Sequence, residues 1–282
     1  MAKNSGHFIE ERPRRSNRKK SSGIKAAVIA AALIIIVFAL VIMGPKLGNK
    51  DNTSPSADRQ TEQVTEAPTE AGAPASYMME HSEVIPQVEF KAGCETYACT
   101  MMLQTLGYDM DEYRFLENYL EIHPVYYGDD GNRYGPDMYS GQAGDIYGGW
   151  GVYSPAMAKY INHYFDDIGE TKRAVALEGV PLRELCEKYV ANDTPVMVWA
   201  TTWLMEPYEK DSWIVDYVDE NAKYEIGDTF TWLQNEHCMV LVGYDDENYY
   251  LMDSCAGEIS EFDRETTEER YSQIGMQAIV VE

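Results

Sequence analysis

The fold of this chain follows from two short stretches, Ala92-Gly-Cys-Glu-Thr-Tyr-Ala-Cys99 and Glu236-His-Cys-Met-Val-Leu-Val-Gly-Tyr-Asp-Asp246. In the first stretch, Cys94 opens an amphipathic helix, and in the second, His237 opens an apolar strand. The following strand ends at Asp253. A thiol nucleophile, its base and the group that orients the base need this order and placement. The pattern therefore predicts a cysteine-nucleophile enzyme.

The segments around these residues predict helices first and strands later. The Gly-, Tyr- and Asp-rich residues 123–152 read as a long loop, and a turn between two of the strands predicts a hairpin. This order is typical of an α+β fold with an antiparallel sheet. The expected helices are Cys94–Leu106, Asp111–Leu120, Pro155–Phe165 with Ser154 as its N-cap, and Pro181–Ala191; the expected strands are 195–200, 238–243, 249–253 and 277–281.

The position of Cys94 favours a reactive thiol. Free N–H groups and the positive end of the dipole at a helix N-terminus lower the pKa of a thiol. Gly93 allows a tight turn onto the helix, and backbone N–H groups there can stabilise an oxyanion. Cys99, five residues into the helix, is the better candidate for a buried structural cysteine. Glu95 is interpreted as a first-turn residue that complements the dipole.

His237 and Asp253 are expected to meet across the hairpin, where Asp253 would fix the imidazole tautomer. A histidine without such a partner would more often be structural. Gln87 is a candidate for completing the oxyanion hole, with an exposed strand glutamine as the equally good alternative. Trp150, Tyr153, Thr201, Trp203 and Trp232 are candidates for lining a substrate groove, although core packing explains each almost as well.

The five cysteines form no metal-binding pattern, and neither a metal nor an organic cofactor is expected. Four of them could form two disulfides, but free cysteines packed in the core are the favoured interpretation. The net charge is −24, with +6 in residues 1–25 and −30 in the remainder. This acidity argues against nucleic-acid binding and favours a soluble surface or a cationic substrate or partner.

The N-terminal third predicts a membrane tether. Residues 26–45 are uncharged and apolar on every side, and twenty helical residues span about 30 Å, the thickness of a bilayer core. The basic residues 1–25 predict a cytoplasmic N-terminus and an extracytoplasmic remainder. An uncleaved signal anchor is favoured over a cleaved signal peptide, because the run is long and no good cleavage site follows. Residues 46–83 read as a flexible linker, and 84–282 as one globular domain.

Residues 85–282 resemble the bacteriocin-processing, double-glycine type of papain-like cysteine peptidase, and most closely its stand-alone bacterial branch. The likeness lies in Gly93-Cys-Glu95, Gly151-Val-Tyr-Ser-Pro155, Thr194-Pro-Val-Met-Val-Trp-Ala-Thr201 and the block from His237 to Asp253. The resemblance implies a papain-like fold in which a helical lobe packs on an antiparallel sheet. It also implies Cys94 as nucleophile, His237 as base, Asp253 as orienter and Gln87 as the oxyanion residue.

The departures from that family are small. Gln87 lies seven residues before Cys94, where the family often has six, and Ser254 stands where the family usually has proline. The expected function is a membrane-anchored extracytoplasmic cysteine peptidase acting on a peptide or protein substrate. Two alternatives stay open: a hydrolase of peptidoglycan stem peptides, or an acyltransferase, on the same fold near the cell wall; and a non-catalytic surface binding module.

Overall fold

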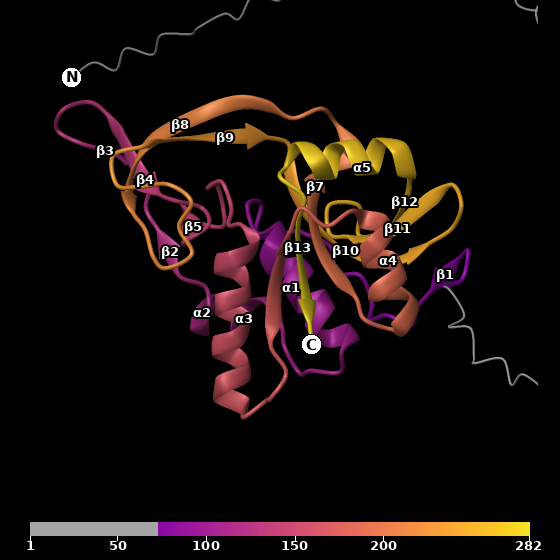
Figure 1. Cartoon of the computed structure of the whole chain (residues 1–282). Helices are drawn as coiled ribbons and strands as arrows, with labels where there is room; N and C mark the ends of the chain where they lie inside the picture. Colours follow the sequence, from indigo (N-terminus) through magenta and orange to yellow (C-terminus); the bar gives the residue numbers. More distant parts are fainter. Residues whose placement is uncertain (1–72) are drawn as a thin grey trace, which may run out of the picture. The chain divides into compact units, whose positions relative to one another are not determined.

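The computed structural model describes residues 73–282, and the predicted basic tail, membrane anchor and most of the linker lie outside this range. Within it, no helix is both long and apolar enough to cross a bilayer. Figure 1 shows helices packed against a central sheet, with a second, smaller sheet to one side. The predicted α+β class and antiparallel sheet are therefore confirmed.

The central sheet has seven strands, in the order β12-β11-β10-β7-β13-β6, with β1 also paired to β10. All of these pairings are antiparallel. The predicted hairpin is present as β10 and β11. The strands are β1 (Tyr77–Met78), β6 (Ala174–Glu178), β7 (Val196–Thr201), β10 (Glu236–Tyr244), β11 (Asn248–Asp253), β12 (Glu258–Asp263) and β13 (Gln277–Val281).

The remaining strands form two smaller sheets. One has four strands in the order β3-β4-β8-β9, and the other pairs β2 with β5. Their short strands interrupt the segment 123–152, which otherwise consists of turns and irregular backbone, so the predicted long loop is confirmed only in part. Within this segment, β4 pairs with β8, which is distant in sequence. The strands are β2 (Ile122–His123), β3 (Tyr126–Tyr127), β4 (Arg133–Pro136), β5 (Gln142–Ala143), β8 (Tyr208–Tyr217) and β9 (Thr229–Gln234).

The helices lie close to their predicted positions. The third one begins at Ser154 itself, with Tyr153 as its N-cap, so the predicted cap is wrong by one residue. The hydroxyl of Ser154 is instead bonded to the buried side chain of Gln277. Helix α5 was not predicted. The helices are α1 (Cys94–Thr105), α2 (Glu112–Asn118), α3 (Ser154–Ile168), α4 (Leu182–Lys188) and α5 (Arg264–Gln273), with short 3-10 turns η1 (Val190–Asn192) and η2 (Thr202–Leu204).

Helix α1 lies in the core and is not amphipathic, contrary to the prediction. It is buried from Cys94 through Leu103, and it packs against β10. A helix that is enclosed on all sides needs no polar face. Its partner β10 is buried along its whole length. This packing brings the first turn of α1 next to the first residues of β10, where the predicted nucleophile and base are located.

Candidate active site

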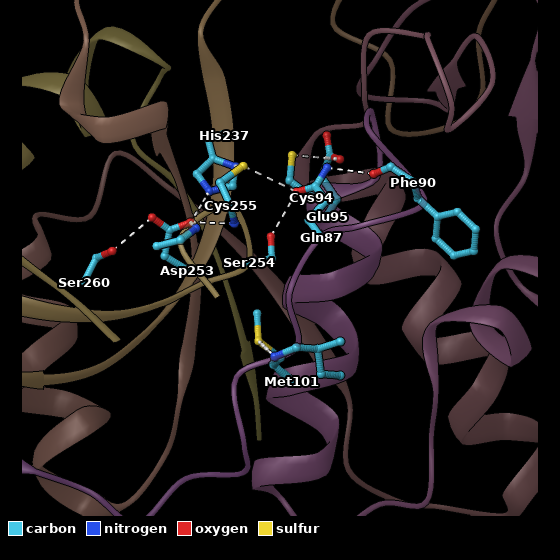
Figure 2. Close-up of polar contacts among 12 residues, drawn as sticks. Gln87, Phe90, Cys94, Glu95, Met101, His237, Asp253, Ser254, Cys255 and Ser260 are labelled. Carbon is cyan, nitrogen blue, oxygen red and sulfur yellow. Dashed lines mark hydrogen bonds and ion pairs between the residues drawn. The ribbon is translucent and has the colours of Figure 1, made fainter. Parts of the chain in front are cut away.

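His237 and Asp253 form a buried pair. The His237 Nε2 lies 2.8 Å from Asp253 Oδ1, and the two side chains are 2% and 0% exposed. Asp253 Oδ1 also accepts a hydrogen bond from the Cys255 backbone N–H, at 2.9 Å, and Oδ2 accepts one from the Ser260 hydroxyl, at 3.0 Å. Figure 2 shows these groups around the carboxylate. The predicted meeting of His237 with Asp253 across the hairpin is thus present, and the carboxylate is fixed from several sides.

The electrostatics of this pair favour an ion pair. Burial lowers the pKa of His237, but the hydrogen bond that the ring donates to Asp253 and the nearby Cys255 outweigh this effect and raise that pKa to about 10. Burial raises the pKa of Asp253, but its bond with His237 outweighs this effect, so the pKa is below its usual value. An imidazolium next to a carboxylate results. With Nε2 engaged by Asp253, Nδ1 is the nitrogen left for a reacting group.

The Cys94 thiol faces away from this pair. Its Sγ donates to Glu95 Oε2 at 3.3 Å, and Figure 2 shows the sulfur turned toward that carboxyl group. Among the described residues no hydrogen bond joins Cys94 to His237. Burial, followed by the charges of Glu95 and Glu236, raises the pKa of the thiol well above its usual value. The predicted lowering of this pKa is therefore wrong for this arrangement, because burial of the thiol and two nearby acids outweigh the end of the helix.

Glu95 has a larger role than its position in the first turn predicts. It is 1% exposed, and its Oε1 accepts the backbone N–H of Val152 at 2.9 Å. Burial raises the pKa of this carboxyl group, and the hydrogen bond from Val152 opposes that rise. Glu95 therefore ties the first turn of α1 to the segment that leads into α3.

Glu236 was not singled out from the sequence. It is 7% exposed, and its Oε1 has no hydrogen-bond partner in the described structure. Burial and the charge of Glu95 raise its pKa well above the usual value, while His237 and the Trp232 indole oppose this. The Trp232 Nε1 itself completes no hydrogen bond within the described residues. The signal that could have identified Glu236 in the sequence is its position directly before the predicted base, His237.

Gln87 bridges the two halves of the site. Its Nε2 donates to the carbonyl of Phe90 at 2.7 Å, and its Oε1 accepts from the Ser254 hydroxyl at 3.0 Å. Its backbone N–H donates to the carbonyl of Ser254 at 2.7 Å. Gln87 is therefore held between the approach to α1 and the turn after Asp253 (Figure 2). Its role in an oxyanion hole stays a prediction.

Cys255 is a second thiol at the site that sequence reasoning missed as a site residue. Its Sγ lies 3.9 Å from His237 Nδ1 and 3.6 Å from Gln87 Oε1, and the residue is exposed. Its place two residues after Asp253 was the signal that could have found it. All five cysteines are free, as the sequence favoured.

A cavity of about 470 Å³ opens beside Cys94 and Glu236. Two of the predicted substrate-binding residues, Trp150 and Trp232, line it. Tyr153 and Thr201 are buried and are not part of its lining, and Trp203 is exposed outside it. The structure thus brings two of the five predicted residues to the cavity that contains the predicted nucleophile.

Two groups at the site have the side-chain types that bind metal ions. The ligand atoms of His237, Asp253 and Cys255 lie within 4.8 Å of one another, as do those of Cys94, Glu95 and Glu236. The closeness of the first three residues follows from the ion pair of His237 with Asp253 and from the Cys255 N–H that donates to Asp253. In the second group, the thiol already donates to Glu95 Oε2, whereas one oxygen of Glu236 has no hydrogen-bond partner in the described part of the chain.

Comparisons with known proteins agree with this geometry. The model of the Peptidase_C39 like family matches residues 78–279. The uncharacterized protein YvpB of Bacillus subtilis (strain 168) is 24% identical over 257 residues, which cover 86% of this chain and 94% of YvpB. The crystal structure of a C39-like peptidase candidate from Bacillus anthracis superposes with a TM-score of 0.58 at 25% identity, over 71% of this chain and 94% of that one.

Proposed function

The chain belongs to the Peptidase_C39-like family, and we propose that it is a cysteine peptidase with Cys94 as nucleophile, His237 as acid and base, and Asp253 as orienter. The observation that carries this proposal is the buried pair of His237 and Asp253, with 2.8 Å between Nε2 and Oδ1. It lies at the start of a strand that packs on the helix begun by Cys94. A buried, oriented histidine beside a cysteine at a helix N-terminus is suited to acyl transfer.

The chemistry requires the Cys94 thiol to leave Glu95 and turn toward His237. The thiol proton passes to water, because His237 is already an imidazolium, and the resulting thiolate is stabilised by that imidazolium. The thiolate attacks the peptide carbonyl, and the imidazolium protonates the leaving amine. The neutral imidazole next takes a proton from water, which hydrolyses the thioester. The Cys94 backbone N–H and the Gln87 amide are the proposed oxyanion donors.

Cys94 is preferred over Cys255 as the nucleophile, although Cys255 lies nearer to His237 Nδ1 in this structure. Cys94 begins a helix, so free backbone N–H groups point toward a bound carbonyl. It also lines the cavity of about 470 Å³, which gives a substrate side chain a place beside the thiol. Cys255 follows a strand end and is not part of that lining.

Hydrolysis of a mixed peptide library by the purified full-length chain tests this proposal. We expect cleavage that is lost, by at least about a thousandfold, in Cys94→Ala and in His237→Ala. Cys255→Ala is the matched control and should keep most of the activity. Full cleavage by Cys94→Ala, or loss of cleavage in Cys255→Ala alone, would overturn the assignment of the nucleophile.

We further propose that residues 26–45 anchor the protein in the cell membrane, with the N-terminus cytoplasmic and residues 84–282 extracytoplasmic. The support is the uncharged run of twenty residues after a basic segment, a pattern typical of a signal anchor. The substrate would then be a peptide or protein outside the cytoplasm. Protease added to intact protoplasts should degrade the C-terminal domain, and complete protection would contradict this orientation.

A further inference from the structure

The cavity beside Cys94 is lined by a buried carboxyl group, one oxygen of which has no hydrogen-bond partner within residues 73–282. This residue is Glu236, which is only 7% exposed. It lines the cavity, and its Oε1 makes no hydrogen bond among the described residues. Glu95 lies next to it, with ligand atoms of Cys94, Glu95 and Glu236 all within 4.8 Å of one another. Buried carboxyl groups normally have a cation or several donors as partners.

The backbone at Gly151 lies against both Glu95 and Glu236. Its φ of +137° lies in a region that favours glycine. A Cβ at this position would collide with Glu95 Oε1 and would lie 3.3 Å from Glu236 Oε2. The backbone therefore passes directly against both carboxyl groups, and Gly151 itself places no side chain over them.

The other charged groups of the cavity do not neutralise Glu236. Asp211 is paired with Arg133 at 2.8 Å. Lys210 donates to Gln234 Oε1 at 2.8 Å. Lys91, like Lys210, is exposed at the rim, where water screens its charge. Among the described residues that line the cavity, the interior thus has an excess of acid, and both lysines are exposed to solvent.

We propose that Glu236, supported by Glu95, is a specificity-determining residue that selects substrates with an ammonium group on the residue next to the scissile bond. This inference rests on the proposed peptidase function. The cavity contains both the Cys94 thiol and Glu236, so a substrate side chain that enters it comes from a residue near the bond under attack. Lysine and other diamino acids carry such an ammonium group at the end of an aliphatic side chain.

The electrostatics of Glu236 agree with this assignment. Burial and the neighbouring Glu95 raise the pKa of Glu236, which favours the protonated form of the carboxyl group. An entering ammonium group would favour the ionised form and so displace that proton. A neutral side chain of the same length would gain nothing from the acid and would leave it buried and unpaired.

The experiment compares two peptidyl chloromethyl ketones on the full-length chain, one with lysine and one with norleucine next to the electrophile. The two side chains have the same methylene chain and differ in the ammonium group. We expect the lysine probe to label Cys94 about 10- to 100-fold faster. In Glu236→Gln this ratio should fall to about one. Glu209→Gln, which removes the same charge from an exposed residue of β8, is the matched control and should keep the wild-type ratio.

A second measurement does not depend on the nucleophile. Nα-acetyl-lysine amide and Nα-acetyl-norleucine amide are titrated while the indole N–H resonance of Trp232 is followed by NMR. Only the lysine derivative should shift this resonance, and Glu236→Gln should abolish the shift. If neither probe labels Cys94 but this shift is present, the proposed function fails and the cation site stands.

Equal labelling by the two probes, or a lysine preference that survives in Glu236→Gln, would overturn the inference. The same holds if the NMR titration shows no difference between the two derivatives. Protection of Cys94 by zinc that Glu236→Gln removes, without any lysine preference, would assign the acids to a metal ion and likewise overturn it.

Discussion

Two adjacent residues of β10, Glu236 and His237, belong to two buried clusters with opposite electrostatics. His237 is joined to Asp253, so a cation and an anion are buried together. Glu236 is beside Glu95, so two acids are buried together. The pKa of Asp253 is below its usual value and that of Glu236 is well above it. A buried carboxyl group that is hydrogen-bonded to a cation therefore fixes geometry, whereas one with an oxygen that has no hydrogen-bond partner in the described structure is suited to bind a cationic ligand.

The largest effect is expected when the first cluster is broken. Asp253→Asn leaves His237 buried without its anion, so the free energy of unfolding should fall by about 3–5 kcal/mol. Peptide hydrolysis should fall by at least about a hundredfold, because the imidazole loses its orientation. Urea denaturation and steady-state kinetics measure both.

Ser260→Ala, which removes only the hydroxyl bonded to Asp253 Oδ2, is the control and should cost about 1 kcal/mol. Equal losses in the two variants would contradict the ion pair.

The same pair predicts a pH dependence of stability. The pKa of His237 is raised from 6.5 to about 10, so its contribution is full below pH 6.5 and is lost as pH rises through about 10. The pKa of Asp253 is lowered, so its contribution is present above the usual carboxyl pKa and is lost as pH falls below that value. The free energy of unfolding, measured from pH 3 to 10, should show both losses in the wild type. Asp253→Asn should flatten both, and an unchanged profile would refute the assignment.

Glu236→Gln is expected to have a smaller effect of opposite sign. The pKa of Glu236 in the folded chain is above its usual value, so this group disfavours folding once pH exceeds that value. The variant should therefore be more stable by about 0.5–2 kcal/mol at pH 7, and the gain should vanish near pH 4. Thermal denaturation at both pH values measures it. A loss of stability at pH 7, with Glu209→Gln unaffected, would mean that Glu236 is already satisfied.

Gly151→Ala tests the close approach to the two acids. The added methyl group collides with Glu95 in a backbone conformation that disfavours alanine, so stability should fall by about 1–3 kcal/mol. Gly148→Ala is the control, since a Cβ there meets no atom within 4 Å. A melting temperature that is unchanged in Gly151→Ala would contradict this, because it would show that the backbone around residue 151 moves at little cost to accommodate the methyl group.

The smallest effect is expected for an ion pair on the surface. Arg183 and Glu187 are four residues apart on α4, with Nε 2.8 Å from Oε1, and both are largely exposed. Arg183→Ala should therefore shift the denaturation midpoint only slightly. Chemical denaturation in low and high salt measures this. A loss comparable to that of Asp253→Asn would show that burial is not what separates the two pairs.

The sequence was sufficient to predict the part of the site that depends on local pattern. His237 at the start of an apolar strand and Asp253 at the end of the next one define a hairpin, and antiparallel pairing then brings them together. The helix from Cys94 was also predictable, because Gly93 and Gly107 mark its ends. These features need only neighbours along the chain.

The remainder depends on contacts between distant segments. Nothing near Glu95 in sequence indicates that Val152 will donate to it or that Glu236 will lie beside it. The lowered pKa predicted for Cys94 was wrong for this reason, since the burial that raises this pKa most, and the neighbouring Glu236, come from packing α1 on β10. The short strands of 123–152 were missed likewise, because β4 pairs with β8, about 80 residues later. Pattern alone does not encode such partners.

The most direct test of the central claim is peptide mapping by mass spectrometry after brief exposure of the full-length chain to an epoxide inhibitor of cysteine peptidases. The account predicts stoichiometric labelling at Cys94 that disappears in His237→Ala and is kept in Cys255→Ala. Labelling at Cys255, or equal labelling of several cysteines, would contradict it and would show that the buried His237 and Asp253 pair does not activate Cys94.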